Sequence, residues 1–584
     1  MLRRPIARFL SRSLLMMSLA QLAVGCNQRA ADRAGAIGRA SDTGGTAAGT
    51  GVPGDTTTAV VVDSTASDRP AEERRKAEAS QTTAPHAAPT GATGVGAGGA
   101  ATGGALAAAP MYRGGKGRGA PAADGQSGEG YKHYGANAWT DTTRDHLSTF
   151  AADVDTASYT IARRKLTEGS LPPAAAVRVE EFVNYFRYGY PAPTGGQPFA
   201  VHLDAAPSPF NPGRHVLRVG VTTRTKSIAE RKKANLVFLV DVSGSMHAPD
   251  KLELAKRSLR ILVDNLKDGD TVALVTYAGS TRVVLPATGL EHKGRIVSAI
   301  EDLTAGGSTA MGSGLELAYQ EAMKGLGPDA ESRVLVLSDG DANVGATSHR
   351  ELLDRIAGKV KEGVTLSTIG FGMGNYKDEM MEQLANKGNG NNYYIDGLSQ
   401  AKRVFAEQLG STLEVVAQDV KLQVDFDPGQ VARYRLVGYE NRDIADDSFR
   451  DDKVDAGEIG AGHQVTALYE LELTRDADKR RPLVTVRVRH KAPKGTRAEE
   501  AAFAFAPASL APSFAAASAD LRFAFATAAF ADVLRGAEDA EHWSLAEIGK
   551  LAAAAAGDDA DRKELVSLVE RARALRGGQA TLAR

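Results

Sequence analysis

Strand and helix signals alternate between residues 234 and 395, and this alternation constrains the fold more than any other feature. Short apolar runs typical of buried strands occupy 235–241, 271–277, 333–338, 364–370 and 392–395. Between them lie segments whose apolar residues recur every three or four positions, the clearest comprising Leu252, Ala255, Leu259, Leu262 and Leu266. The pattern favours an α/β fold with a parallel, doubly wound, Rossmann-like sheet covered by helices on both faces. Residues 282–285 are expected as an antiparallel edge strand.

Regions of β character flank this α/β region on both sides. Residues 199–222 alternate apolar and polar side chains, which is typical of antiparallel strands. The same character returns after residue 409, with strands expected at 415–426, 433–439, 464–473 and 483–490. The sequence therefore predicts one β domain made from two chain segments, with the α/β domain inserted between them.

Helices are expected beyond the β segments. Residues 155–166 and 177–186 are predicted helices on the amino-terminal side, and an alanine-rich helical region begins near residue 518. Asp155 is predicted to be the N-cap of the first helix, because a short acidic side chain can accept bonds from the first free backbone N–H groups. The alternative interpretation is a cation site formed by Asp153 and Asp155.

The first 26 residues are typical of an export signal. Four arginines between residues 3 and 12 precede an apolar stretch that is too short to cross a bilayer. This stretch ends in Leu-Ala-Val-Gly-Cys26, which resembles the lipobox of bacterial lipoproteins, and Cys26 is the only cysteine in the chain. Lipidation of Cys26 anchors a protein of this kind to a membrane. The alternative is that an ordinary peptidase cuts nearby and Cys26 is incidental.

A long segment of small residues follows the export signal. From residue 27 to about 130 the chain contains Gly, Ala, Thr, Ser and Pro and almost no large apolar side chains, so it is expected to be disordered. The predicted organisation is a signal peptide (1–26), a linker (27–135), an N-terminal region of helices and then strands (140–222), the α/β domain (233–410) and a β-rich and then helical C-terminal region (411–584).

Three oxygen-rich segments lie in loops of the predicted α/β domain. Asp241, Ser243 and Ser245 follow its first strand, Thr309 lies in a glycine-rich loop, and Asp339 follows the third strand. Open α/β sheets bind ligands at the carboxyl ends of their strands, so these side chains are expected to meet. Two carboxylates and three hydroxyls are hard oxygen ligands that suit Mg²⁺, which also keeps several waters. The alternative is that Asp241 caps the next helix and the serines only satisfy a loop.

Together these segments resemble the metal-ion-dependent adhesion site of von Willebrand factor type A (VWA) domains. The resemblance covers residues 235 to about 410. It implies that Ser243, Ser245 and Thr309 coordinate Mg²⁺, or Mn²⁺ or Ca²⁺, directly. Asp241 and Asp339 then support the ion through bound water or bind it themselves. In this family a Glu or Asp from a partner protein fills the position that the domain leaves open.

The remaining motifs support other chemistry less well. Residues 307–313 lack the lysine of a phosphate-binding loop, and 370–374 are followed by Asn375 where a dinucleotide fingerprint requires its third glycine, so a tight turn is expected there. Asp341 and Asn343 either shape the rim of the metal site or close the Asp-Gly turn. The net charge of −1 gives no global attraction to nucleic acid.

These observations predict a lipoprotein of the bacterial envelope, not an enzyme, that binds a protein through a divalent metal ion. Residues 148–159 also resemble the segment that precedes the VWA domain in bacterial secreted lipoproteins. Two alternatives stay open. In the first, the protein is a structural scaffold and the metal only stabilises its fold. In the second, it is a metal-assisted hydrolase, although no His or Glu stands within the motifs as a general base.

Overall fold

A computed structural model describes residues 128–227, 229–340, 349–408, 413–454, 456–478 and 480–582 of the chain. The predicted signal peptide, Cys26 and the linker as far as residue 127 lie outside these residues. Among the helices that are described, none combines the length and the apolarity needed to cross a lipid bilayer.

The described strands of the α/β domain form a six-stranded sheet in the order β10-β9-β8-β5-β6-β7. All adjacent pairs are parallel except β6 and β7, which confirms both the parallel sheet and its antiparallel edge. The strands are β5 (Lys233–Asp241), β6 (Thr271–Tyr277), β7 (Thr281–Gly289), β8 (Ala330–Ser338), β9 (Val364–Phe371) and β10 (Asn392–Ile395).

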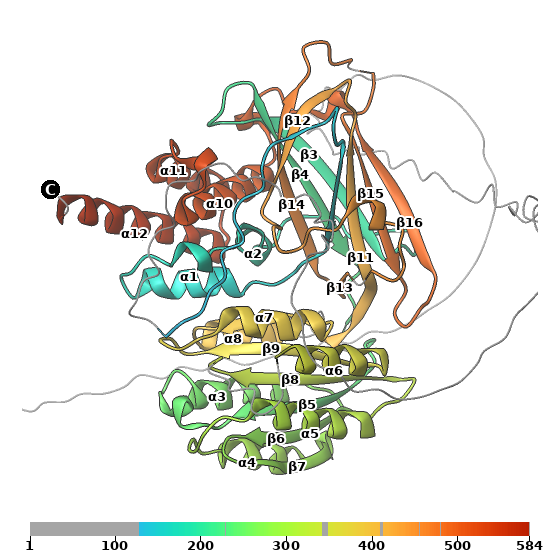
Figure 1. The fold of residues 1–584 in the computed structure, drawn as a ribbon, viewed down its shortest axis with the longest axis vertical. Coiled ribbons are helices and arrows are strands. Elements are labelled where there is room, and N and C mark those ends of the chain that lie inside the picture. The colour runs from blue at the N-terminus through green and yellow to red at the C-terminus, as the bar shows by residue number, and fades with distance from the viewer. Residues whose placement is uncertain are drawn as a thin grey trace, which may run out of the picture. The chain divides into compact units, whose positions relative to one another are not determined.

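Helices cover both faces of this sheet, as Figure 1 shows. One face packs against α3 (Leu252–Asp264), α4 (Lys293–Glu301) and α8 (Leu398–Lys402). The other packs against α5 (Met311–Lys324), α6 (His349–Lys361) and α7 (Asp378–Lys387). Strand β5 is buried on both faces, which explains why its sequence is an unbroken apolar run. Leu236, Phe238 and Val240 enter the first core, whereas Val237 and Leu239 enter the second.

The flanking segments join into one β domain, as predicted, and the structure shows that this domain is a β-sandwich. One sheet has the order β1-β12-β14-β4-β3, in which β4 from before the α/β domain pairs with β14 from after it. The second has the order β13-β11-β15-β16, and β2 also pairs with β11. The first sheet consists of β1 (Thr140–Asp141), β3 (Phe199–Pro207), β4 (Arg214–Thr223), β12 (Val431–Val437) and β14 (Gln464–Leu473). The second consists of β2 (Leu147–Ala151), β11 (Val415–Phe426), β13 (Gly457–Gly460), β15 (Val484–Lys491) and β16 (Ala498–Phe505).

A helical layer covers the outer face of the first sheet. It combines two helices from before the α/β domain with three from the end of the chain, in one apolar core. Val216 of β4 and Leu468 of β14 belong to that core, which fixes the helices on the sheet. The helices are α1 (Ala157–Thr167), α2 (Val179–Tyr185), α10 (Ala519–Arg535), α11 (Leu545–Ala556) and α12 (Ala560–Leu582).

The prediction that Asp155 caps α1 is wrong. The N-cap residue is Thr156, whose side chain makes no capping bond. Asp155 instead accepts a hydrogen bond from Asn392 N of β10 at 2.8 Å and one from Arg442 Nη2 at 3.0 Å. Arg442 Nε also donates to Asp153 at 2.9 Å, so a guanidinium supplies the positive charge between these carboxylates.

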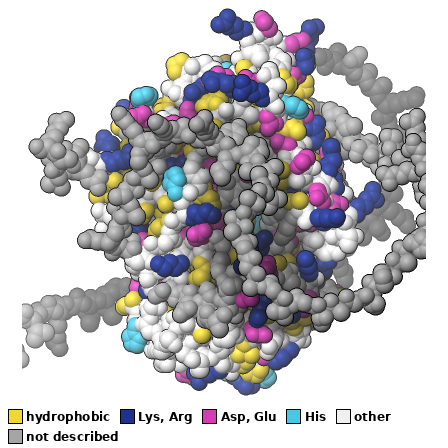
Figure 2. Space-filling view, viewed as in Figure 1, with side chains coloured by type: hydrophobic (Ala, Val, Ile, Leu, Met, Phe, Trp, Pro, Cys, Tyr) yellow, Lys and Arg dark blue, Asp and Glu magenta, His cyan; other side chains and the backbone are white. Residues whose placement is uncertain are grey.

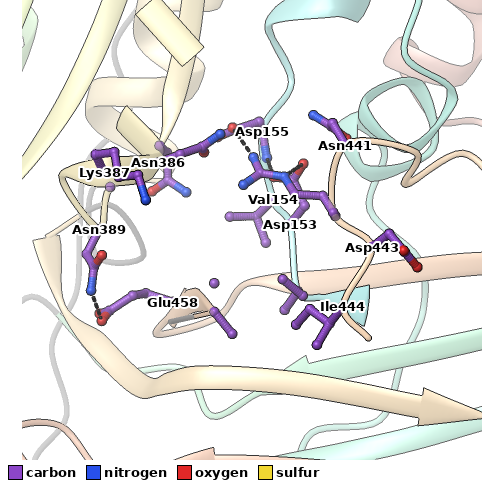
Figure 3. Close-up of a pocket in the computed structure, with 17 residues that line it drawn as sticks. Asp153, Val154, Asp155, Asn386, Lys387, Asn389, Asn441, Asp443, Ile444 and Glu458 are labelled. Atoms are coloured by element: carbon purple, nitrogen blue, oxygen red, sulfur yellow. Dashed lines mark hydrogen bonds and ion pairs between the residues drawn. The ribbon is translucent and has the colours of Figure 1, made fainter. Parts of the chain in front are cut away.

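Asp155 thus joins three parts of the chain at one point. These are the segment before α1, the α/β domain and the loop after β12, and they surround a polar cavity of about 280 Å³ (Figure 3). Other ion pairs reinforce this junction. Arg178 contacts Asp378 of α7, and Arg163 of α1 holds Asp396 through two bonds of 2.7 Å. Strong side-chain bonds therefore tie the inserted domain to the flanking regions.

Candidate metal site

The predicted metal-binding segments lie at the carboxyl ends of two adjacent parallel strands. Asp241 is the last residue of β5, and Asp339 directly follows β8, its neighbour in the sheet. Both carboxylates are fully buried. Parallel pairing places them at the same edge of the sheet, which is where the topology of an open α/β sheet puts a ligand.

Hydrogen bonds from its own loop and from β8 orient the Asp241 carboxylate. One oxygen accepts from Ser243 N at 2.8 Å, and the other accepts from Ser338 Oγ at 3.1 Å. Burial chiefly, and the nearby Asp339 to a lesser extent, raise the pKa of Asp241 to about 6, while the bonds from Ser243 and Ser338 limit the rise. A buried pair of carboxylates of this kind gains from a positive charge placed beside it.

The serine hydroxyls of the first loop converge. Ser243 Oγ lies 3.0 Å from Ser245 Oγ, and Ser243 is buried whereas Ser245 is half-buried. Two oxygens at this separation can both face one small cation. A 3₁₀ turn at Gly244–His247 holds the loop in place before α3 begins.

The loop that carries Thr309 is bonded directly to the Asp241 loop. Gly306 N donates to Val242 O at 2.7 Å, and Gly244 N donates to Gly307 O at 3.0 Å. Gly307 has φ +89°, and a Cβ at this residue would lie 3.2 Å from Gly279 N, so a side chain there would be strained. Thr309 follows two residues later, half-buried, just before α5 begins.

Two polar residues that the sequence did not assign to the metal site contact Asp339. Lys251 Nζ lies 2.9 Å from Asp339 Oδ2, and Asn375 Nδ2 donates to the same oxygen at 3.2 Å. Asn375 ends a bend at residues 373–375 that follows β9, at the place where a tight turn was expected. Lys251 directly precedes α3. A cation at the amino end of a helix is unfavourable because it opposes the helix dipole. A lysine at this position therefore indicates that an acidic partner compensates its charge, and this was the signal available in the sequence.

The donor set fits a small, hard divalent cation. It offers carboxylate and hydroxyl oxygens, and the two carboxylates are buried where an uncompensated negative charge is unfavourable. In the part of the chain that the structure describes, no three His, Cys, Asp or Glu side chains gather in a way that could hold a metal, so a metal at this site depends on its hydroxyl oxygens as well as its two carboxylates. Asp341 and Asn343 lie outside the described residues.

Comparisons with known proteins agree with this architecture. The family model of the von Willebrand factor type A domain matches residues 235–407. A model described as von Willebrand factor matches residues 125–218, and a model described as the C-terminal part of the uncharacterized protein YfbK matches residues 411–575. The three matches lie side by side along the chain.

Individual relatives were also found. The chain is 39% identical over 467 residues to the uncharacterized protein YfbK of Escherichia coli (strain K12), a match that covers 75% of this chain and 80% of YfbK. It is 29% identical over 212 residues to the uncharacterized protein sll0103 of a Synechocystis species, covering 36% of this chain and 49% of that protein. The solved structure of a von Willebrand factor type A protein from Catenulispora acidiphila matches with a TM-score of 0.39 and 18% identity, covering 62% of this chain and 87% of that one. The extent of the YfbK match shows that the chain belongs to the YfbK family of VWA-domain proteins.

Proposed function

We propose that this protein binds an acidic segment of another protein through a divalent metal ion held by its VWA domain. Ser243, Ser245 and Thr309 would coordinate the ion, and Asp241 and Asp339 would support it. The ion supplies a positive centre that polarises and binds an anionic oxygen. A metal ion that is surrounded by few charged ligands and many neutral hydroxyls stays electrophilic. This favours a Glu or Asp side chain as the ligand from the partner.

The main support for this proposal is the arrangement of buried carboxylates beside converging hydroxyls. Asp241 and Asp339 lie at adjacent strand ends, and the loop leading to Thr309 is bonded to the loop of Ser243. Mg²⁺ is the preferred ion of the proposal, with Mn²⁺ and Ca²⁺ as alternatives. We do not propose an enzyme, since the motif segments 241–246, 306–314 and 339–340 contain no His or Glu that could act as a general base.

The proposed location is the bacterial envelope, with a lipid on Cys26 as the anchor. The support is the export signal and the sequence around Cys26. Figure 2 shows basic and acidic side chains interspersed over the visible face of the described residues, in keeping with the net charge of −1. This distribution gives no electrostatic reason to propose a nucleic-acid partner.

Crosslink capture from intact envelopes tests the proposal. The full chain is expected to capture its partner in Mg²⁺ and to lose it in a chelator. Asp241→Ala should lose the same partner in Mg²⁺, whereas Asp264→Ala should retain it, because Asp264 forms only an exposed ion pair with Lys293. A partner that is captured equally by the wild type and by Asp241→Ala would contradict the proposal.

The second candidate is a scaffold in which the metal only stabilises the VWA domain. The ion pairs of Asp378 and Asp396 and the hydrogen bond from Asn392 N favour it, because they tie the VWA domain to the flanking regions. Under this alternative, partner capture persists in the chelator, and removal of the metal only lowers the melting temperature of the protein.

A further inference from the structure

Lys251 is a buried lysine aimed at the candidate metal site. Its side chain is 8% exposed, and its Nζ contacts Asp339 Oδ2 at 2.9 Å and Asn375 Oδ1 at 2.8 Å. An ammonium group is costly to bury unless charged and polar groups surround it, as they do here. The sequence places this lysine 88 residues before its carboxylate partner, so only the fold brings them together.

The glycine-rich turn after β9 makes room for this lysine. Gly372 has φ +70°, and a Cβ built there would lie 2.4 Å from Lys251 Cε and 2.5 Å from its Cγ. The aliphatic stem of Lys251 therefore runs against the bare backbone of Gly372. The turn also supplies Asn375, the second partner of the ammonium group. The geometry of the turn is thus matched to the path of one side chain.

The acidic neighbour of Lys251 in the sequence is bound elsewhere. Asp250 Oδ2 accepts from Arg164 Nη2 of α1 at 2.6 Å, and Arg164 also donates to Tyr394 Oη at 3.0 Å. Tyr394 Oη in turn donates to Gly372 O at 2.6 Å. Arg164, which also pairs with Glu168, is thus the bonded partner of Asp250, whereas Lys251 bonds Asp339.

The charges of the site set what it can bind. Asp241 and Asp339 bring two negative charges, and Lys251 returns one positive charge. With a divalent ion bound, the ion and these three side chains together carry one net positive charge, which a single carboxylate neutralises. Without Lys251 the same site would be neutral once the metal is bound. The like charge of the ammonium also repels the metal ion at short range in a buried environment.

We infer that Lys251 determines the specificity of the metal site: it weakens metal binding and reserves the bound ion for an anionic ligand. The inference rests on the proposed function, because it requires that the site of Asp241 and Asp339 would hold a divalent ion. This role and a purely structural role of Lys251 predict opposite changes in metal affinity when the lysine is removed. A lysine that merely orients Asp339 would strengthen metal binding, so its removal would weaken it.

The test compares full-length wild type, Lys251→Met and Lys256→Met. Lys256 lies on α3 and pairs with Glu253, so its replacement makes the same change of net charge away from the site. Calorimetry measures Mn²⁺ affinity, and the paramagnetic relaxation of labelled acetate measures binding of a carboxylate to the Mn²⁺-loaded protein. Lys251→Met should bind Mn²⁺ about tenfold more tightly or better and acetate about threefold more weakly, because a unit charge is removed from a buried site. Lys256→Met should match the wild type in both measurements.

Each outcome decides between explanations. Unchanged or weaker Mn²⁺ binding by Lys251→Met, with a wild type that binds Mn²⁺, overturns the role of Lys251 and leaves the proposed function intact. A wild type that binds no Mn²⁺ overturns the proposed function, and the inference with it. If Lys251→Met does not fold, Lys251→Gln takes its place, because glutamine keeps a hydrogen-bond donor for Asp339. Loss of the fold in both variants, with Lys256→Met folded, shows that Lys251 is structural and overturns the inference.

Discussion

Replacement of Arg442 by alanine is expected to destabilise the protein strongly, because this residue closes the junction between the VWA domain and the β-sandwich. Its guanidinium donates to Asp153 at 2.9 Å and to Asp155 at 3.0 Å. These carboxylates are only 4% and 2% exposed. The substitution leaves both of them buried without their basic partner, although Asp155 keeps its bond from Asn392 N.

The magnitude follows from burial. Removing one partner of a buried ion pair costs about 3–5 kcal/mol, because the charge left behind is not compensated. The pKa of Asp155 already lies well above its usual range, chiefly through burial and then through repulsion from Asp153. Without Arg442 this carboxyl takes up a proton still more readily, which limits the loss at low pH. The destabilisation should therefore be largest at neutral pH and smaller near pH 5.

Scanning calorimetry of the full chain measures this effect, with Arg433→Ala as the matched control. Arg433 also pairs with a glutamate, Glu472, through three hydrogen bonds, but its side chain is 46% exposed. Exposed pairs contribute about 0–1 kcal/mol, so Arg433→Ala should barely change the melting temperature. Arg442→Ala should lower it by several degrees. Equal melting temperatures for the two variants would refute the reasoning.

Two further predictions concern a buried carboxyl group and the membrane anchor. Glu180 is 1% exposed. Burial chiefly, and then the nearby Glu440, Glu181 and Asp153, raise its pKa to about 8, while a hydrogen bond from Tyr439 N limits the rise. A raised pKa in the folded state means that stability is present at low pH and is lost as the pH rises toward 8. Glu180→Gln should therefore gain about 1–3 kcal/mol over the wild type between pH 5 and pH 8 in denaturant titrations, and a gain that is independent of pH would contradict this. Cys26→Ser should abolish incorporation of labelled fatty acid and release the protein from membranes on fractionation; labelling that persists would disprove the proposed anchor.

The VWA sheet could be predicted from the sequence because its signals are local. Each strand is a continuous apolar run bounded by polar residues, as in 236–240, and both faces of such a strand are buried. Strand β16 was missed for the opposite reason. Its sequence, Ala-Glu-Glu-Ala-Ala-Phe-Ala-Phe, has weak strand propensity, and it becomes a strand through continuous antiparallel pairing with β15.

Of the polar residues discussed above, only those that belong to the sequence motif could be predicted. The strand ends locate Asp241 and Asp339, because parallel topology brings adjacent strand ends together. The roles of Asp155 and Lys251 depend instead on partners far away in the sequence, Arg442 and Asp339. Local rules assigned Asp155 to a helix cap and assigned Lys251 no role. Long-range ion pairs leave no local pattern in the chain.

The central claim is that the VWA domain holds a divalent metal ion, and calorimetric titration of the full chain with Mn²⁺ tests it most directly. The wild type and Asp264→Ala should bind one Mn²⁺ with the same affinity. Asp241→Ala should lose binding, because it removes one of the two buried carboxylates that favour the ion. Undiminished binding by Asp241→Ala, or no binding by the wild type, would contradict the account.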